Sequence, residues 1–569
     1  MKTIEKLLEG ILSSTVAKVF PEADSSNLFV QRTANPVFGD FQTNFAMAAS
    51  KQLKMQPRLI AEKITEALSD PAIAKTEIAG PGFINIHLSS EFLGNFIRKL
   101  GTEPYDYDFL DRHGDVVIDY SSPNIAKRMH IGHLRSTVIG DSIKRIYNKL
   151  GFHTISDNHI GDWGTQYGKL IVAYRGWLDK QAYEQSPVEE LERIYVDFEK
   201  RAEENPALVD DARREVKKLQ DGDPENMRLW QEFIDVSMKE YGRIYDRLDI
   251  TFDTHNGESF YHDMMPGIVD LLVTKGLAVE DQGALVVFFD ETENLHPCII
   301  RKQDGAFLYA TSDLACIDYR TKNYDVNRLV YVTDERQQPH FKQVFLIAKK
   351  LGWNVPLEHV WFGMMRFADE VFSTRKGNVI RLDDLLNEAV RRARVIVEEK
   401  NPELPDKEKD AVAEAVGVGA VKYADLSQHR TSVVTFEWDK MLSFEGNTSP
   451  YLQYVYARIR SIQRKAEETG VGQTGNHNVL PDNPSEKALA VLLTGFPIII
   501  VKAAEGYKPN LIADYLFELA QAFNTFYNAL PILKETDPIR TSRLILADRT
   551  AQTIKEGLSL LGIKTLERM

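Results

Sequence analysis

The feature that most constrains this chain is a strand, then a turn ending in His130-Ile131-Gly132-His133, then a helix. Val116–Ile118 is a β-branched apolar run, Pro123 prevents its continuation, and residues 134–147 carry apolar side chains at helical spacing. The two histidines therefore lie at a helix start, where free backbone N–H groups and the helix dipole attract phosphate. Imidazole donors there can stabilise charge on an attacked α-phosphate, and Gly132 lets a flat adenine ring approach the backbone. The sequence thus predicts a nucleotide site at a strand-to-helix turn.

The 569 residues suggest three or four domains. We predict a small α+β domain over residues 1–108 and a Rossmann-like α/β domain with a parallel sheet over 109–372. The latter carries a charged helical insertion at about 187–248. A loop and helical connecting region over 373–446 and an α-helical domain over 447–569 complete the multidomain α/β plus all-α fold. The strand candidates of the α/β domain are Val116–Ile118, Thr154–Ser156, Ala284–Phe289 and Leu329–Val332, and after Ser373 we expect no strands.

Charge and cysteine usage exclude some classes of protein. The net charge of −14 argues against a uniformly basic nucleic-acid surface, so any such contact must use local basic faces. Cys298 and Cys316 are isolated, which predicts core thiols and no thiolate zinc site. The most apolar stretch, 491–501, is short and interrupted, and residues 1–12 form an amphipathic helix, not a signal peptide. We therefore expect a cytoplasmic protein without a membrane partner.

A cationic substrate group is suggested by Tyr309 and Asp313, which share one face if a helix begins there. Asp119, at the carboxyl end of the strand before the histidine turn, can add a second negative charge in the crevice where such sheets bind ligands. Two carboxylates select for a guanidinium, whose planar fork they can bind bidentately. The alternative for Asp313 is an acid that complements a helix N-terminus.

Three further segments admit both functional and structural interpretations. Residues 371–378 form a polar, cationic loop that can close over phosphates or be a solvated turn. His159–Gln166 brackets Trp163 between two glycines, which indicates either close backbone approach at the crevice or a structural tryptophan corner. Tyr451–Arg460 combines aromatic and cationic side chains, as in helices that stack bases and bind phosphate, although half of these aromatics must be core.

Taken together, these residues resemble the class I aminoacyl-tRNA synthetases, specifically the bacterial-type arginyl-tRNA synthetases. The resemblance covers essentially the whole chain. Its markers are 122–127 before the histidine turn, the Gly161–Gly164 block, 418–426, 444–451 and the terminal 567–569. It implies an N-terminal domain for the tRNA elbow, a Rossmann-like catalytic domain and a helical anticodon-binding domain. It also implies that L-arginine and ATP, with Mg²⁺, give arginyl-adenylate, and that arginine passes to tRNA(Arg).

The resemblance also implies roles for individual residues. The catalytic residues would be His130, His133 and Lys127, and ATP would contact His130, Gly132, His133, Met365, Arg375 and Lys376. Arginine would be held by Asp119, Asn124, Tyr309, Asp313 and Gln337, and tRNA by Asn35, Phe38, Gln42, Tyr451, Tyr454 and Arg458. No metal ligands are implied.

The chain departs from the class pattern at one point. The second class signature, KMSKS, falls on Val371–Arg375, and both of its lysines are replaced. Lys127 is the candidate for the lost phosphate charge, with Arg375 and Lys376 as weaker ones. The resemblance further implies that tRNA must be bound before the adenylate forms. The expected state is a monomer, although the sequence does not distinguish monomer from dimer.

Two alternatives stay open at this stage. One is a related ligase for another amino acid: cysteine would call for a zinc site, and a large aliphatic side chain for an editing insertion. The other is a non-catalytic tRNA-binding or regulatory protein that retains the scaffold. The intact set of His130, Gly132, His133, Asn124 and Asp313 argues against it.

Overall fold

The structure is a computed structural model that describes residues 1–33, 35–367, 380–468 and 479–569. The chain divides into two compact units. The first contains Met1–Asp111, Asn401–Leu404 and Ser443–Met569, and the second contains Arg112–Lys400 and Pro405–Leu442. The two terminal segments, which we predicted as separate domains, thus lie in one unit, and the finer domain boundaries stay predictions.

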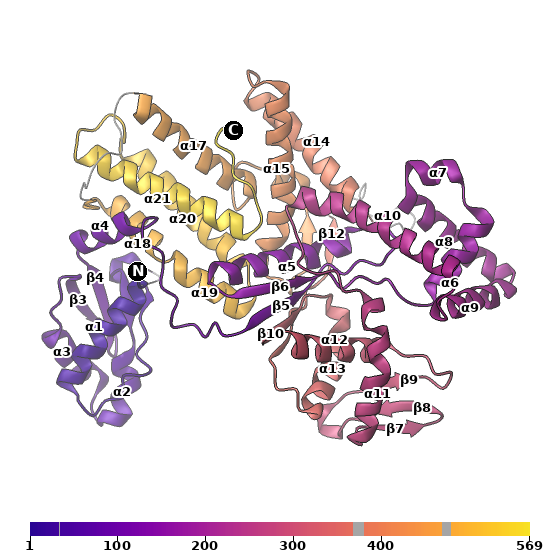
Figure 1. The fold of residues 1–569 in the computed structure, drawn as a ribbon. Coiled ribbons are helices and arrows are strands. Elements are labelled where there is room, and N and C mark those ends of the chain that lie inside the picture. Colours follow the sequence, from indigo (N-terminus) through magenta and orange to yellow (C-terminus); the bar gives the residue numbers. More distant parts are fainter. Residues whose placement is uncertain (34, 368–379, 469–478) are drawn as a thin grey trace. The chain divides into compact units, whose positions relative to one another are not determined.

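The N-terminal part of the first unit is an antiparallel sheet with helices, as predicted (Figure 1). Its strand order is β1-β2-β4-β3. Helix α1 begins after Thr3, whose hydroxyl accepts a hydrogen bond from the Lys6 N–H, and buries one apolar face. The elements are α1 (Ile4–Val19), β1 (Gln31–Arg32), the 3₁₀ turn η1 (Pro36–Phe38), β2 (Phe41–Thr43), α2 (Phe45–Leu53), α3 (Pro57–Ala67), β3 (Ile73–Ala79), β4 (Phe83–Leu88) and α4 (Ser90–Lys99).

The C-terminal part of the first unit is helical in its described residues. It consists of α17 (Ser449–Glu468), α18 (Pro484–Thr494), α19 (Phe496–Gly506), α20 (Asn510–Ala529) and α21 (Ile539–Leu560). Helix α18 packs against α20, α21 and the N-terminal helix α4. By length and composition alone, one stretch of the described chain could cross a membrane, Pro484–Gly506, and 72% of its most apolar window is buried, as in a core helix pair.

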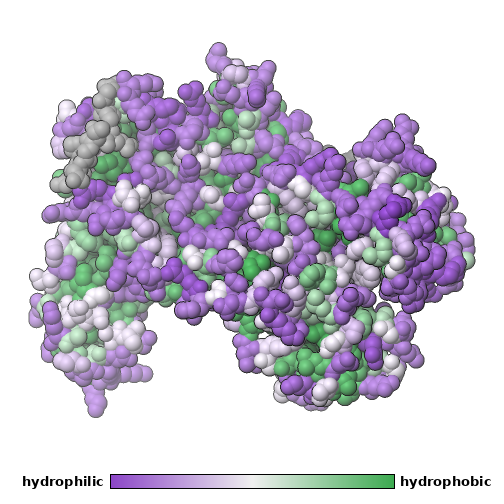
Figure 2. Space-filling view, in the orientation of Figure 1, coloured by the Kyte–Doolittle hydropathy of each residue, from purple (hydrophilic) through white to green (hydrophobic). Residues whose placement is uncertain are grey.

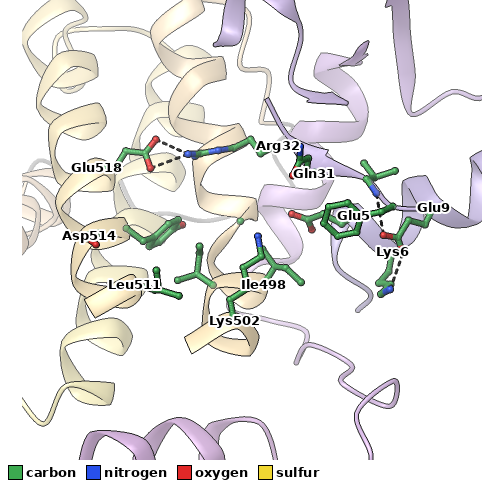
Figure 3. A pocket seen from close by; sticks show the side chains of 15 residues that line it. Glu5, Lys6, Glu9, Gln31, Arg32, Ile498, Lys502, Leu511, Asp514 and Glu518 are labelled. Atoms are coloured by element: carbon green, nitrogen blue, oxygen red, sulfur yellow. Dashed lines mark hydrogen bonds and ion pairs between the residues drawn. The ribbon is translucent and has the colours of Figure 1, made fainter. Parts of the chain in front are cut away.

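A cavity of about 350 Å³ lies inside this unit, where α1 and β1 face α19 and α20 (Figure 3). Arg32 donates from Nη2 to both carboxylate oxygens of Glu518, at 2.7 and 2.9 Å. Glu5 is only 6% exposed, and among the described residues its Oε2 has no hydrogen-bond partner. Burial raises the pKa of Glu5 above its usual value. The ionised form of this carboxylate therefore destabilises the folded unit.

The second unit is built on a parallel sheet with strand order β11-β10-β5-β6. The register pairs Val117 with Leu329 and Ile155, so the predicted strands at 116–118, 154–156 and 329–332 lie side by side. Its strands and first helix are β5 (Asp115–Asp119), α5 (Ile131–Lys149), β6 (His153–Asp157), β10 (Val326–Tyr331) and β11 (Leu357–His359). Val117, Leu329 and the buried faces of neighbouring helices form one apolar core, which includes the free thiols of Cys298 and Cys316.

The charged insertion predicted at about 187–248 is helical and contains α8 (Pro187–Glu204), α9 (Ala207–Gln220) and α10 (Pro224–Leu248). It packs against the two helices that precede it, α6 (Gln166–Trp177) and α7 (Lys180–Gln185), which the prediction did not include. Hydrophilic side chains cover the surface over α8 and α9 (Figure 2), and many belong to ion pairs within the insertion, such as Arg193 with Glu190 and Asp197. This face is solvated, whereas α10 contacts residues that follow β5 and β6, since the Tyr245 hydroxyl lies 2.8 Å from Oγ of Ser121 and 3.1 Å from Nδ2 of Asn158.

Two predictions about strands were wrong. Residues 284–289 do contain a strand, but it lies in a separate antiparallel sheet of order β7-β8-β9, because the short turn at Gln282-Gly283 pairs it with its neighbour. Strands also do not cease after Ser373, since β13 pairs in parallel with β12. The remaining elements are η2 (Glu258–Met264), α11 (Met265–Thr274), β7 (Ala278–Asp281), β8 (Ala284–Val287), η3 (Glu291–Glu293), β9 (Cys298–Arg301), α12 (Tyr309–Asn323), η4 (Glu335–Gln337), α13 (Gln338–Leu351), β12 (Met365–Phe367), α14 (Leu382–Lys400), α15 (Asp406–Leu426), β13 (Val434–Phe436) and α16 (Trp438–Met441).

Candidate active site

The two histidines of the turn cap helix α5 reciprocally. The N–H of Gly132 donates to Nδ1 of His130 at 3.0 Å, and the N–H of His130 donates to Nδ1 of His133 at 3.1 Å. The two rings lie 4.0 Å apart between centroids. A Cβ at Gly132 would come within 2.8 Å of the His130 ring, so this position must be glycine for the cap to form. The predicted helix start at the histidine pair is therefore present.

The caps also fix the chemistry that the imidazoles can offer. Because each Nδ1 accepts a hydrogen bond, the neutral rings carry their proton on Nε2. Burial lowers the pKa of His133 to about 3, with a smaller contribution from His130. Burial also lowers the pKa of His130, and the charge of Lys127 lowers it further. Both histidines are thus neutral Nε2–H donors near pH 7.

The loop between β5 and the histidine turn is strained. Ser121, Ser122 and Ala126 have φ of 73°, 49° and 61°, a left-handed conformation that costs non-glycine residues about 1–3 kcal/mol each. Helix α10 of the insertion holds this loop. The Oγ of Ser237 accepts from the Ala126 N–H at 3.0 Å, and the Tyr241 hydroxyl lies 2.7 Å from two backbone carbonyl oxygens of the loop.

Lys127 is exposed and lies beside the insertion, with its Nζ 5.2 Å from the centroid of the Tyr195 ring. The segment after the KMSKS-like loop lies directly against the histidine turn, since the Ile131 N–H donates to the carbonyl of Ile380 at 3.0 Å. The loop itself, with Arg375 and Lys376, lies outside the described residues. Met365 is the half-buried first residue of β12.

All five residues predicted to hold an amino acid line one cavity of about 410 Å³ in this unit. They are Asp119, Asn124, Tyr309, Asp313 and Gln337. Asp119 ends β5, and Tyr309 and Asp313 lie one turn apart at the start of α12. The cavity therefore lies at the carboxyl edge of the parallel sheet, where open α/β sheets bind ligands.

The expected pair of carboxylates, Asp119 and Asp313, needs a correction. Oδ2 of Asp119 accepts from Nη2 of Arg320 at 2.7 Å, and the same nitrogen lies 2.7 Å from Oδ2 of Asp157. Arg320 is almost completely buried, and this neighbour was not visible because it lies 201 residues away in the sequence. The negative charge of Asp119 is thus already compensated by Arg320. Asp119 lines the cavity but does not offer it a free carboxylate.

Glu258 supplies the second carboxylate, and our sequence reasoning missed it. It lies at the start of η2 and lines the same cavity as Asp313 and Tyr309. Burial raises the pKa of Glu258 to about 7, and the negative charges of Asp162 and Asp313 add to that shift. Two acidic groups thus face one cavity without a lysine or arginine among its lining residues, which favours a cationic ligand.

The Gly161–Gly164 block positions two residues that line this cavity, Asn124 and Glu258. A Cβ at Gly161 would lie 2.0 Å from Oδ1 of Asn124, so glycine is required for Asn124 to occupy its place. Asp162 accepts from the N–H and hydroxyl of Ser259 at 2.8 and 2.6 Å, which fixes the start of η2 and with it Glu258. Trp163 packs edge-on against Trp230. The block therefore combines the close approach and the tryptophan corner that the sequence left as alternatives.

In the first unit, the residues predicted to contact tRNA form two groups. Asn35 caps the turn η1, since its side chain accepts a hydrogen bond from the Val37 N–H at 3.0 Å. In this turn Val37 is 78% and Phe38 54% exposed. Gln42 lies on the adjacent strand β2. This is an exposed apolar tip beside polar side chains.

On α17, Arg458 lies over the ring of Tyr454 at 4.7 Å and donates to its hydroxyl at 3.1 Å. Tyr451 is half-buried, and its hydroxyl accepts from Asn524 at 2.8 Å. An aromatic face with a cation beside it is a surface on which bases can stack.

One group among the described residues, Asp119, His159 and Cys316, has metal-ligating atoms near one another. Its chemistry opposes a cation, because Arg320 already contacts Asp119 and burial raises the pKa of the Cys316 thiol. That no metal is bound there stays a prediction.

Comparison with known proteins agrees with this geometry. Three family models match the chain: "tRNA synthetases class I (R), catalytic domain" over residues 105–438, "DALR anticodon binding domain" over 452–569, and "Arginyl tRNA synthetase N terminal domain" over 2–88. The histidine-capped helix on a parallel sheet and these matches define a class I aminoacyl-tRNA synthetase fold. Within that class, the chain belongs to the arginyl-tRNA synthetase family.

Individual relatives span the whole chain. An arginine–tRNA ligase of Fusobacterium nucleatum is 55% identical over 570 residues, and one of Chromobacterium violaceum is 44% identical over 585, with all of each chain covered. The arginyl-tRNA synthetase structure of Plasmodium falciparum matches with a TM-score of 0.83 at 29% identity, again over all of both chains. That of Thermus thermophilus has the same TM-score at 24% identity and supports the fold alone.

Proposed function

We propose that this protein is an arginine–tRNA ligase, which activates L-arginine with ATP and transfers it to the 3′ end of tRNA(Arg). The observation that carries the proposal is the cavity at the end of β5, lined in part by the loop that leads to the histidine turn, in which Tyr309, Asp313 and Glu258 come together. Two carboxylates and a phenol fit the five donors of a guanidinium. Asn124 and Gln337, which line the same cavity, are proposed to hold the α-amino and carboxylate ends.

In the activation step, the arginine carboxylate attacks the α-phosphate of ATP in line and pyrophosphate leaves. No enzyme nucleophile takes part, so positioning and electrostatics provide the catalysis. The Nε2–H groups of His130 and His133 and the N-terminus of α5 stabilise the charge that develops on the phosphate. ATP enters as its Mg²⁺ complex.

Lys127 is proposed to supply the phosphate charge that the altered KMSKS signature lacks. Its ammonium lies close enough to the histidines to lower the pKa of both. Gly132, Met365, Arg375 and Lys376 complete the proposed ATP contacts.

For tRNA, we propose contacts through the exposed tip of Asn35, Phe38 and Gln42 and through the aromatic and cationic face of Tyr451, Tyr454 and Arg458 on α17. Activation is proposed to require bound tRNA. The protein is proposed to act as a cytoplasmic monomer, which light scattering on the purified chain would test.

Aminoacylation of total bacterial tRNA with each of the twenty labelled amino acids, ATP and Mg²⁺ tests the function. Charging by arginine alone is expected. Charging by another amino acid would overturn the guanidinium assignment of Asp313 and Glu258, and tRNA binding without any charging would favour the non-catalytic alternative.

A further inference from the structure

One histidine of the cavity has no role in the function proposed above. His340, the third residue of α13, lies with Nε2 2.5 Å from Oδ2 of Asp313 on the neighbouring helix α12. The two helices pack against each other (Figure 1), and both side chains line the cavity. The imidazole is 29% and the carboxylate 19% exposed, so the contact is largely shielded from water.

This contact decides how Asp313 can meet a ligand. A carboxylate has two oxygens, and here one of them is bound by the imidazole N–H while the hydrogen bond restricts rotation of the group. The other oxygen keeps its lone pairs for a donor in the cavity. The His340 ring is itself held edge-on against Phe341, at 5.4 Å between centroids.

We propose that His340 is a positioning residue that holds Asp313 for the guanidinium and thereby sets the selection for a cationic amino-acid side chain. The inference rests on the proposed function, because it assumes that Asp313 binds arginine. It adds a residue and a linkage to that site: a proton on His340 and the guanidinium of arginine compete for the same carboxylate charge.

The surroundings of His340 decide the sign of this competition. Burial lowers the pKa of His340, but the hydrogen bond and charge of Asp313 outweigh it and raise the pKa above its usual value. The other titratable side chains that line the cavity are Glu258 on η2, Asp119 on β5, Tyr331 on β10, Tyr309 on α12 and His159 after β6. Near the pair lie also His359 on β11, whose pKa the charge of His340 helps to lower, and Cys298 on β9, whose pKa the charge of Asp313 helps to raise. When arginine neutralises Asp313, His340 loses its main stabilising charge and should release its proton more easily.

Three variants separate positioning from structure. His340→Leu removes the donor, whereas His340→Gln keeps an N–H donor but cannot titrate. His153→Gln is the matched control, because His153 Nδ1 lies 2.6 Å from Asp115 in a second histidine–aspartate pair outside the cavity. At a pH well above the pKa of His340, where no proton competes with arginine, we expect His340→Leu to raise KM for arginine about tenfold to a hundredfold, which corresponds to the loss of one hydrogen bond to a charged group. KM for ATP should change little, and His340→Gln should restore most of the arginine KM.

Selectivity gives a second kinetic readout. Citrulline has the shape of arginine without its charge, so it reports how much the site favours a cation. In His340→Leu, the ratio of the citrulline inhibition constant to the arginine KM should fall at least fivefold, whereas it should be unchanged in His153→Gln.

The linkage is measured directly by NMR on wild-type protein with ¹³Cε1-labelled histidine, the His340 signal being assigned by its loss in His340→Gln. Saturating arginine is expected to lower the pKa of His340 by at least half a unit and to leave the His153 signal unchanged. An unmoved His340 pKa, or an unchanged arginine KM in His340→Leu, would overturn the inference. If wild-type protein does not charge tRNA with arginine, the proposed function fails instead, so the two failures are distinguishable.

Discussion

Glu258 offers the sharpest test of the cavity, because it is half-buried, lines the cavity together with Asp313 and has a pKa that burial raises to about 7. Glu258→Gln keeps the shape of the side chain and removes the charge. Truncating a buried charge pair costs about 2–5 kcal/mol, and at pH 7 about half of the free enzyme must first lose a proton, which offsets only about 0.4 kcal/mol. The net cost of about 1.6 kcal/mol or more means that kcat/KM for arginine should fall about fifteenfold or more.

The pH dependence follows from the same group. Burial raises this pKa above the usual 4.5, so the binding-competent, ionised form is lost as pH falls from 8 to 6. The ratio of wild-type to variant kcat/KM should therefore grow with rising pH over that range and level off above pH 8. Arginine-dependent pyrophosphate exchange in the presence of tRNA measures it.

The folded state provides the control for Glu258→Gln. An ionised buried carboxylate destabilises the free protein as pH rises past 4.5, so the variant should melt at the same temperature as wild type or higher at pH 8. A variant that is intact by this criterion and keeps its arginine kcat/KM within threefold, or keeps a constant ratio from pH 6 to 8, would refute the assignment of Glu258 to the guanidinium.

Three further substitutions test other parts of the molecule. Asp313→Asn should cost about 2–5 kcal/mol in discrimination of arginine from citrulline, and an unchanged KM and rate would refute its role. Lys127→Ala should slow pyrophosphate exchange far more than it weakens arginine binding, measured by calorimetry, and a change in arginine affinity alone would contradict a phosphate role. Glu5→Gln should raise the free energy of unfolding of the first unit by about 1 kcal/mol at pH 8, measured in urea. The reason is that Glu5 is ionised at this pH, whereas burial favours its neutral form and raises its pKa. The gain should shrink toward pH 4.5, and an equal gain at both pH values would mean that the buried charge is not the cause.

The parts of the site that the sequence predicted are those with local causes. The histidine turn could be predicted because a β-branched run, a proline and a helical period follow one another within a short segment. The shared face of Tyr309 and Asp313 follows from their spacing of four once a helix begins at Tyr309, as it does. Such features depend on neighbours in the chain, so propensity and periodicity carry them.

The parts that it missed depend on contacts between distant residues. In the sequence, nothing distinguishes Glu258 from other acidic residues in polar loops. Its place in the cavity depends on the hydrogen bond from its neighbour Ser259 to Asp162, which lies 97 residues away. Asp119 resembles a free carboxylate in the sequence, but the structure pairs it with Arg320 on α12, 201 residues further along the chain. The strand at 284–287 has the apolar composition of a parallel core strand, but its pairing is set by a tight turn and not by composition.

The helical insertion shows how a segment that reads as solvated surface can support catalysis. Three non-glycine residues of the loop before the histidine turn are left-handed, and at about 1–3 kcal/mol each that conformation persists only where surrounding contacts enforce it. Helix α10 supplies such contacts through Ser237 and Tyr241, which bind the loop backbone directly. The loop carries both Asn124 and Lys127, one on the amino-acid cavity and one before the nucleotide turn. Because α10 contacts the backbone at both positions, we expect the insertion to couple the geometry of the proposed arginine site to that of the proposed ATP site, although neither ligand is proposed to contact α10.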